Sequence, residues 1–233
     1  MGLTQSEFFD AIETFTGNSR ESDEIMAGLD TQGVTTDDLD AGDALLATAK
    51  LKAGLQGKAA LALQLHMPIY DAAEKLAHAE YQDLVGGCRA ELSEAQIKGL
   101  QIKEMPEDTA KFVKAAIALL DAIPEDDDIK TALANRKRGA ARLAVIRAAV
   151  NDFDKQFKKL KRLKGALKQT TTDRNDAIKP LRTWFIKFSR FARLGLKTKK
   201  DLLGQILKPT PKRKAGKSKT TGTATNTASP SAQ

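Results

Sequence analysis

The sequence contains few of the residues on which disulfide-stabilised and catalytic proteins rely. It holds one cysteine, Cys88, and two histidines among 233 residues. An internal disulfide is therefore impossible, and catalytic histidine chemistry has little material to work with. Aromatic residues make up only 5%, and no segment shows sustained period-two alternation of apolar and polar residues. These absences exclude a disulfide-rich scaffold and disfavour a β-sandwich or β-barrel.

Long apolar runs and targeting segments are missing as well. No stretch approaches the roughly 18 consecutive apolar residues that a membrane-spanning helix requires. The first residues lack the basic start and the apolar core of a secretory signal. We therefore expect no membrane span and a cytoplasmic location.

Motifs for catalysis and for cofactor or metal binding are equally scarce. Glu74 and His78 are one helical turn apart and could share a metal ion, but an exposed pair at this spacing explains them as well. Residues 211–218 look like the end of a phosphate-binding loop, yet Pro211 stands where such a loop needs glycine. We expect a protein that is not an enzyme and uses no cofactor and no metal.

The residues that are present favour helices. Hydrophobic residues make up 41% of the chain, and Ala, Leu, Lys and Asp are prominent. Apolar positions recur at an offset of 104 residues, for example Phe8 with Phe112, Leu39 with Leu143 and, farther along, Leu84 with Phe188. A chance match between two helical segments of similar periodicity is the alternative to an internal duplication.

The offset predicts an all-α fold of two tandem, related helical units that form an antiparallel helix bundle. An acidic unit spans residues 1–104, and a basic unit spans residues 105–208. Residues 209–233 contain five bases, no acid and no aromatic residue, so we expect a disordered basic tail.

Within each unit the sequence predicts the same order of helices. Capping boxes at Thr4 and Ser93 start the first and last helices of the first unit, and Gly17 ends the first helix. Short helices follow near residues 23–29 and 127–133, and long helices come next. We expect the chain to reverse at residues 67–68 and 170–173 before a fourth helix, with a kink or a late start at Pro180. Thr198 and Asp201 stand where the second unit would need its last cap.

Apolar periodicity indicates which residues form the core. A heptad-like seam in the second unit has steps of three and four residues; its members are Leu143, Ile146, Val150, Phe153, Phe157, Leu160, Leu163 and Leu167. The residues around Phe185 and Phe188 form a second apolar face, which we expect to pack antiparallel against the seam. Cys88 matches Ala192 and is interpreted as a core residue. Trp184 matches Glu80, so both a buried and an outward position stay open.

Charge is distributed very unevenly along the chain. Residues 1–104 hold 8 Lys and Arg against 18 Asp and Glu, whereas residues 105–208 hold 25 against 12. The two units therefore carry net charges of −10 and +13, and the tail adds +5. Opposite charges could attract within one molecule, join one molecule to the next, or leave the basic unit and tail to bind polyanions such as nucleic acid.

The leading hypothesis is a non-catalytic helical interaction or assembly protein that binds itself or another protein. The alternative is a nucleic-acid-binding protein without sequence specificity, since no base-reading motif accompanies the basic clusters. Bases that spread over every exposed face would serve solubility, whereas a single stripe would favour nucleic acid. The candidate contact residues for a polyanion or an acidic partner are Arg136, Lys137, Arg138, Lys158, Lys159, Lys161, Arg162, Lys197, Lys199, Lys200, Lys212, Arg213 and Lys214.

Overall fold

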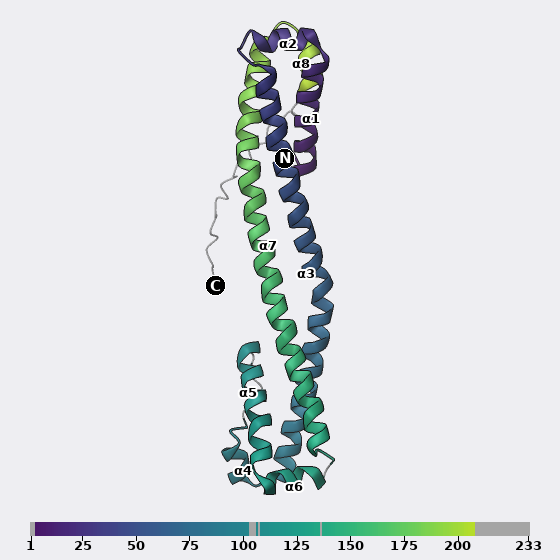
Figure 1. Ribbon diagram of the computed structural model, residues 1–233, viewed down its shortest axis with the longest axis vertical. Helices are drawn as coiled ribbons and strands as arrows, with labels where there is room; N and C mark the ends of the chain where they lie inside the picture. The colour runs from purple at the N-terminus through teal and green to yellow at the C-terminus, as the bar shows by residue number, and fades with distance from the viewer. Residues whose placement is uncertain (1–2, 103–105, 107, 136, 208–233) are drawn as a thin grey trace, which may run out of the picture. The chain divides into compact units, whose positions relative to one another are not determined.

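A computed structural model describes residues 3–102, 106, 108–135 and 137–207, and these residues confirm the all-α fold. No strand occurs among them. The helices, in chain order, are α1 (Gln5–Glu21), α2 (Asp23–Asp30), α3 (Thr36–Glu91), α4 (Glu94–Gly99), α5 (Thr109–Ala122), the short 3-10 helix η1 (Ile123–Glu125), α6 (Asp127–Asn135), α7 (Ala140–Gly195) and α8 (Lys200–Ile206). The predicted tail lies outside the described residues. Figure 1 shows the arrangement of the helices.

Contacts divide the chain into two compact units with other boundaries than the predicted ones. The first unit combines residues 1–36 with residues 188–233, and the second unit comprises residues 37–187. The boundaries differ from 104 and 208 because the helices near the two ends of the chain, α1 and α8, pack against each other.

The first unit is built around the buried face of α1. The predicted capping box is present: the Thr4 hydroxyl accepts a hydrogen bond from the Glu7 backbone, and the Glu7 side chain accepts one from the Thr4 backbone. Phe15 of this helix is fully buried. The prediction that Gly17 ends α1 was wrong, because the helix continues to Glu21. Near its end the Asn18 side chain donates a hydrogen bond of 2.7 Å to the carbonyl oxygen of Gln205, next to the end of α8.

Two glycines let α2 and the end of α7 approach each other within the first unit. A Cβ atom at residue 195 would overlap the carbonyl oxygen of Gly28, and a Cβ atom at residue 28 would overlap the side chain of Leu196. The first overlap involves backbone, which cannot rotate away as a side chain can. Glycine at position 195 is therefore a packing requirement of this unit.

We predict that Gly195→Ala lowers the free energy of unfolding by about 1–3 kcal/mol, because the methyl group forces α2 away from α7. Gly17→Ala is the matched control: Gly17 lies inside α1 with nothing near its absent Cβ. That change should stabilise by about 0.5–1 kcal/mol through helix propensity. Urea unfolding of both variants measures the difference, and equal effects would show that the close approach does not exist.

The second unit is organised by the pairing of α3 with α7. Trp184 Nε1 donates a hydrogen bond of 3.0 Å to the carbonyl oxygen of Asp38, and His66 Nε2 lies 3.1 Å from the carbonyl oxygen of Gln156. Partner numbers on α7 fall as residue numbers on α3 rise. The two helices therefore run antiparallel within this unit (Figure 1).

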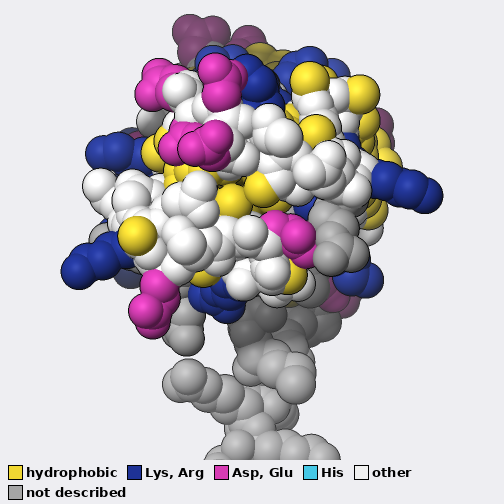
Figure 2. Space-filling view, turned by 90° about the horizontal axis from the view of Figure 1, so that it is seen from below, with side chains coloured by type: hydrophobic (Ala, Val, Ile, Leu, Met, Phe, Trp, Pro, Cys, Tyr) yellow, Lys and Arg dark blue, Asp and Glu magenta, His cyan; other side chains and the backbone are white. Residues whose placement is uncertain are grey.

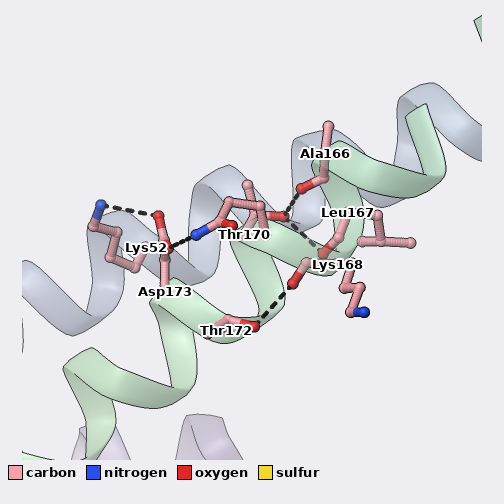
Figure 3. Close-up of polar contacts among 8 residues, drawn as sticks. Lys52, Ala166, Leu167, Lys168, Thr170, Thr172 and Asp173 are labelled. Atoms are coloured by element: carbon pink, nitrogen blue, oxygen red, sulfur yellow. Dashed lines mark hydrogen bonds and ion pairs between the residues drawn. The ribbon is translucent and has the colours of Figure 1, made fainter. Parts of the chain in front are cut away.

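The predicted reversals at residues 67–68 and 170–173 were wrong. Each of α3 and α7 is one continuous helix of 56 residues, and the seam and the residues around Phe185 belong to the same helix, so they do not pack as partners. The Thr170 and Thr172 hydroxyls donate to the carbonyl oxygens of Ala166 and Lys168, at 3.0 and 3.2 Å (Figure 3). Threonines that bond back one turn satisfy themselves inside a helix and need no turn.

Both prolines lie inside the helices that they were expected to interrupt. Pro68 is in α3, and Pro180 is in α7 without a late start there. A proline inside a helix costs about 3 kcal/mol. Burial on either side offsets this cost, since His66 and Tyr70 are buried around Pro68, and Ile178 and Leu181 are buried around Pro180.

The core of the second unit lies where the short helices cover the long ones. An aromatic cluster contains Tyr70, His78 and Tyr81 of α3, Phe112 of α5 and Phe153 of α7, with ring centroids 4.5 to 5.9 Å apart. Asp108 and Asp126 side chains accept backbone hydrogen bonds at the starts of α5 and α6. Five members of the predicted seam are confirmed as core. They are Leu143, Ile146, Val150, Phe153 and Leu160, whereas Phe157, Leu163 and Leu167 are only half-buried.

We predict that Phe153→Ala lowers the free energy of unfolding by about 3–5 kcal/mol, the usual cost of truncating a fully buried phenylalanine. Phe157→Ala, the same change one turn away on the same helix, should cost clearly less because that ring keeps part of its solvent contact. Chemical denaturation followed by circular dichroism gives both values. Equal losses would contradict the placement of Phe157 at the edge of the core.

Helix boundaries recur along the chain. Helices α1, α2 and α3 begin at residues 5, 23 and 36, and α5, α6 and α7 begin at residues 109, 127 and 140. Each start in the second set lies 104 residues after its counterpart in the first set. The same 104 residues separate Glu91 and Gly195, which end the two long helices. The last helices differ. The Ser93 capping box is confirmed for α4, but α8 begins at Lys200 without a side-chain cap, so the expected cap at Thr198 was wrong.

Candidate interaction surfaces

The middle of the α3–α7 pair has little apolar core of its own. None of residues 50–65 on α3 and none of residues 161–177 on α7 is buried. Polar contacts hold this stretch: Lys52 Nζ lies 3.4 Å from Asp173 Oδ2 (Figure 3), and Arg174 donates to Gln56 Oε1 at 3.2 Å. Partly exposed ion pairs contribute about 0–1 kcal/mol. The middle of the helix pair therefore depends on weak contacts, whereas the ends of the pair have a packed core.

An apolar stripe follows this stretch on another side of α3. Its large members are 42–63% exposed, although all are aliphatic; they are Leu51, Leu55, Leu61, Leu65, Ile69 and Leu76. We name this set the α3 stripe. Six of the ten most exposed large apolar side chains among the described residues belong to it. Isolated exposed leucines are ordinary, but a row along one helix is a candidate interaction surface.

The spacing of the α3 stripe fits a helical partner. Positions 51, 55, 58, 62, 65, 69, 72 and 76 follow steps of four and three residues, which is the repeat of a coiled-coil seam, and they include every member of the α3 stripe except Leu61. Ala62 and Ala72 fill the small positions, and Lys58 is the one charged residue among the eight. Lys52, Gln56 and His66, which contact α7, lie outside this set. Hence α3 has one face for α7 and a second face without a described partner.

Sequence reasoning missed this surface. In the sequence, residues 37–66 are richer in alanine and less regular than the seam on α7. The feature that could have revealed the surface is the width of the apolar arc around the helix, because apolar residues occupy two sides of the helix rather than one. Such a helix needs two partners or leaves one side in water.

Half of the described candidate bases of the second unit are engaged within the chain. Arg138 Nη2 lies 2.8 Å from Asp83 Oδ1, and Lys158 Nζ lies 2.6 Å from Asp154 Oδ2. Lys161 Nζ lies 4.3 Å from the ring centroid of Phe157. Three others are exposed; they are Lys137, Lys159 and Arg162.

The remaining candidate bases are in the first unit or outside the described residues. Lys199 Nζ lies 3.6 Å from Glu24 Oε2, and Lys197 and Lys200 are exposed. Four candidates fall outside the described residues; they are Arg136, Lys212, Arg213 and Lys214.

Bases on the middle of α7 surround the helix rather than follow one line. Residues 155–168 contain seven bases and no acid, and all seven are exposed. Successive bases are one to four residues apart, and each residue turns the helix by about 100°, so their side chains leave in many directions. At the end of the second unit formed by α4 and α6, bases and acids are interspersed (Figure 2).

An open groove of about 590 Å³ lies between α5 and α7 in the second unit. Val113, Ile117 and Phe157 give it an apolar floor, and Lys158 and Lys161 stand at its edge. The groove explains why Phe157 is half-buried and why Lys161 lies over its ring.

An acid–base network joins the C-terminal part of α3 to the start of α7. Arg142 pairs with Glu80, and its Nη2 atom lies 3.5 Å from Asp83 Oδ2. Hydrogen bonds from Arg138, with its charge and that of Arg142, hold the pKa of Asp83 below its ordinary value. The acidic half and the basic half of the sequence therefore attract each other here, inside one molecule.

The residues that the sequence analysis considered for catalysis, metal binding or stacking take part in packing and hydrogen bonds within the fold. Burial raises the pKa of the Cys88 thiol to about 11, which keeps it protonated and unreactive at neutral pH. Glu74 accepts a hydrogen bond from the Tyr70 hydroxyl at 2.9 Å, whereas the His78 ring packs on Phe112 at 4.5 Å. Trp184 is buried rather than outward, and Gly42 leaves the room for its ring. Among the described residues no group of three or more potential metal ligands occurs.

Comparisons of the chain with models of known families, with curated proteins and with solved structures find no match. Within the described part of the chain, no helix has the length and apolar character needed to cross a membrane.

We predict that Asp83→Asn destabilises the protein at neutral pH and that its effect disappears in acid. The folded-state pKa of Asp83 is lowered, so the carboxylate adds stability above its unfolded pKa, near 4. This contribution is lost as the pH falls through the folded-state pKa. Urea midpoints of both proteins at pH 7 and at successively lower pH test this, and a difference that stays constant would contradict it.

Proposed function

We propose that this protein is a non-catalytic helical interaction and assembly protein whose working surface is the α3 stripe. The observation that carries the proposal is the exposed coiled-coil spacing of that stripe, most of which lies along a stretch of α3 without buried residues. Such a face gains free energy when another helix covers it, at roughly 25 cal/mol for each Å² of apolar surface removed from water. A cytoplasmic location belongs to the same proposal.

Charge plays a different part in this proposal from the one that the sequence suggested. Arg138 and Arg142 pair with Glu80 and Asp83 inside the chain. The opposite charges of the two halves then serve mainly to dock α3 on α7. Association between molecules rests on apolar contact instead.

Binding of polyanions without sequence specificity is the second candidate. The seven exposed bases of residues 155–168, with no acid among them, favour it. The argument against it is their distribution, because side chains that leave α7 in many directions cannot all reach one phosphate backbone. Lys158, which is paired with Asp154, would also have to give up that partner.

We also propose that the chain is a duplicated unit of about 104 residues and that, within the second unit, the long helices of the two copies pack as a pseudo-two-fold pair. The recurring helix boundaries support this. A two-fold relation also exchanges partners, so the contact of Asp38 with Trp184 should recur between Arg142 and Glu80. Those two residues do form a pair, with Arg142 Nη1 donating to Glu80 Oε1 at 3.2 Å.

Salt separates the candidate functions. We expect sedimentation analysis from 10 µM to 1 mM protein to show an associating species that persists in roughly 1 M salt, because salt screens charges and leaves apolar contact intact. Fluorescence anisotropy with labelled duplex DNA is measured in parallel. A protein that stays monomeric throughout and binds DNA with a steep salt dependence would replace the first proposal by the second.

A further inference from the structure

We propose that the α3 stripe is covered by the α3 stripe of a second copy of this chain, with the two helices antiparallel. This inference rests on the proposed assembly function and names its partner and geometry. The stripe is the only surface in the described residues where exposed large aliphatic side chains follow a coiled-coil spacing.

Size complementarity favours the stripe as its own partner. When two copies run antiparallel around the midpoint between Ala62 and Leu65, each of those residues faces the other one across the axis. In the same register Leu55 faces Ala72, and Leu51 faces Leu76. Large side chains therefore meet small ones in the inner layers, as a packed helical interface requires.

Charge selects the antiparallel direction. Lys58 is the one charged residue in the seam positions, and a parallel pair would place it against Lys58 of the other copy. In the antiparallel register it faces Ile69, where its apolar stem packs and its ammonium group reaches solvent. Residues 47–60 carry three bases and no acid, and the opposite segment, residues 68–79, contains Asp71 and Glu74 against one base, Lys75. Antiparallel pairing thus brings unlike charges together at both ends.

The size of the stripe sets the expected strength. From Leu51 to Leu76 the helix extends about 38 Å, and with a diameter of about 10 Å it offers a footprint on the order of 400 Å² per copy. Stable dimers bury about 1,200–2,000 Å² in total, and weaker, transient ones bury less. We therefore expect a dimer that dissociates in the micromolar to millimolar range.

Substitutions on the stripe test whether it is the contact. The double variant Leu65→Lys, Ile69→Lys should weaken dimerisation more than about tenfold, because a lysine at position 69 would face Lys58 of the other copy and a lysine at position 65 would replace the leucine opposite Ala62. Val145→Lys, Ile186→Lys is the matched control, since both residues are exposed in the same unit, by 51% and 53%, and lie on α7. Association that survives the stripe variant unchanged would overturn this inference and leave assembly through another surface. A wild-type chain that is monomeric at 1 mM protein would overturn assembly itself.

Disulfide trapping tests the direction with milder changes, in a Cys88→Ala background. A mixture of Leu51→Cys chains with Leu76→Cys chains should form a covalent dimer, because these positions face each other and a disulfide needs Cα atoms within about 7 Å. Either chain alone should not cross-link, since identical positions lie about 38 Å apart in the antiparallel pair. Cross-linking of the single-variant samples instead would show parallel pairing and overturn the geometry. A Val145→Cys and Ile186→Cys mixture measures random collision.

Discussion

A helix of 56 residues needs an apolar partner along its whole length, and most features of the second unit follow from how this need is met. Near Phe112 and Phe153 the short helices α5 and α6 complete a core around the long pair. Farther along, α3 and α7 have only each other among the residues of this unit, and polar contacts such as Lys52 with Asp173 replace buried side chains. Two helices alone cannot enclose a core, because each shields only one side of the other.

The two long helices differ in the side chains that they carry on the side away from each other. On α7 the outer side carries lysine and arginine, which water solvates well, so the helix is stable beside a single partner. On α3 the outer side carries leucine and isoleucine, which water solvates poorly. Under the proposed duplication, these sides of α3 and α7 would be corresponding positions of two copies, one solvated and the other suited to contact.

Local sequence signals were enough for much of the fold. The capping boxes at Thr4 and Ser93, the short helices and the first part of the seam were predicted, because each depends on residues within one or two turns. The continuity of α3 and α7 was not. Proline and clustered threonines usually mark turns. Around Pro68 that tendency is overridden by burial against the opposite helix, where His66 contacts Gln156, 90 residues away along the chain. Thr170 and Thr172 instead bond back to carbonyl oxygens one turn earlier.

The candidate surfaces also combine features that are visible in the local sequence with features that depend on residues far apart in the chain. The basic clusters are visible in the sequence, but their ion pairs are not, since Asp83 and Arg138 are 55 residues apart. The burial of Trp184 depends on Gly42, whose small size acts only once the two helices are adjacent. The α3 stripe could have been found from the width of its apolar arc. Its exposure could not, because that depends on which side faces α7.

The packing of α1 on α8 has a consequence for the order in which the chain folds. The hydrogen bond between Asn18 and Gln205 spans 187 residues, so the first unit closes a loop that contains the whole second unit. Since α1 and α2 are synthesised before α8, they are expected to wait for that helix before α1 reaches its contact with it. The second unit, whose residues are all available before α8, can form its core in the meantime and thereby shorten the loop that remains to be closed. Contacts between α1 and α8 are thus expected to form after those of the unit that lies between them in the chain.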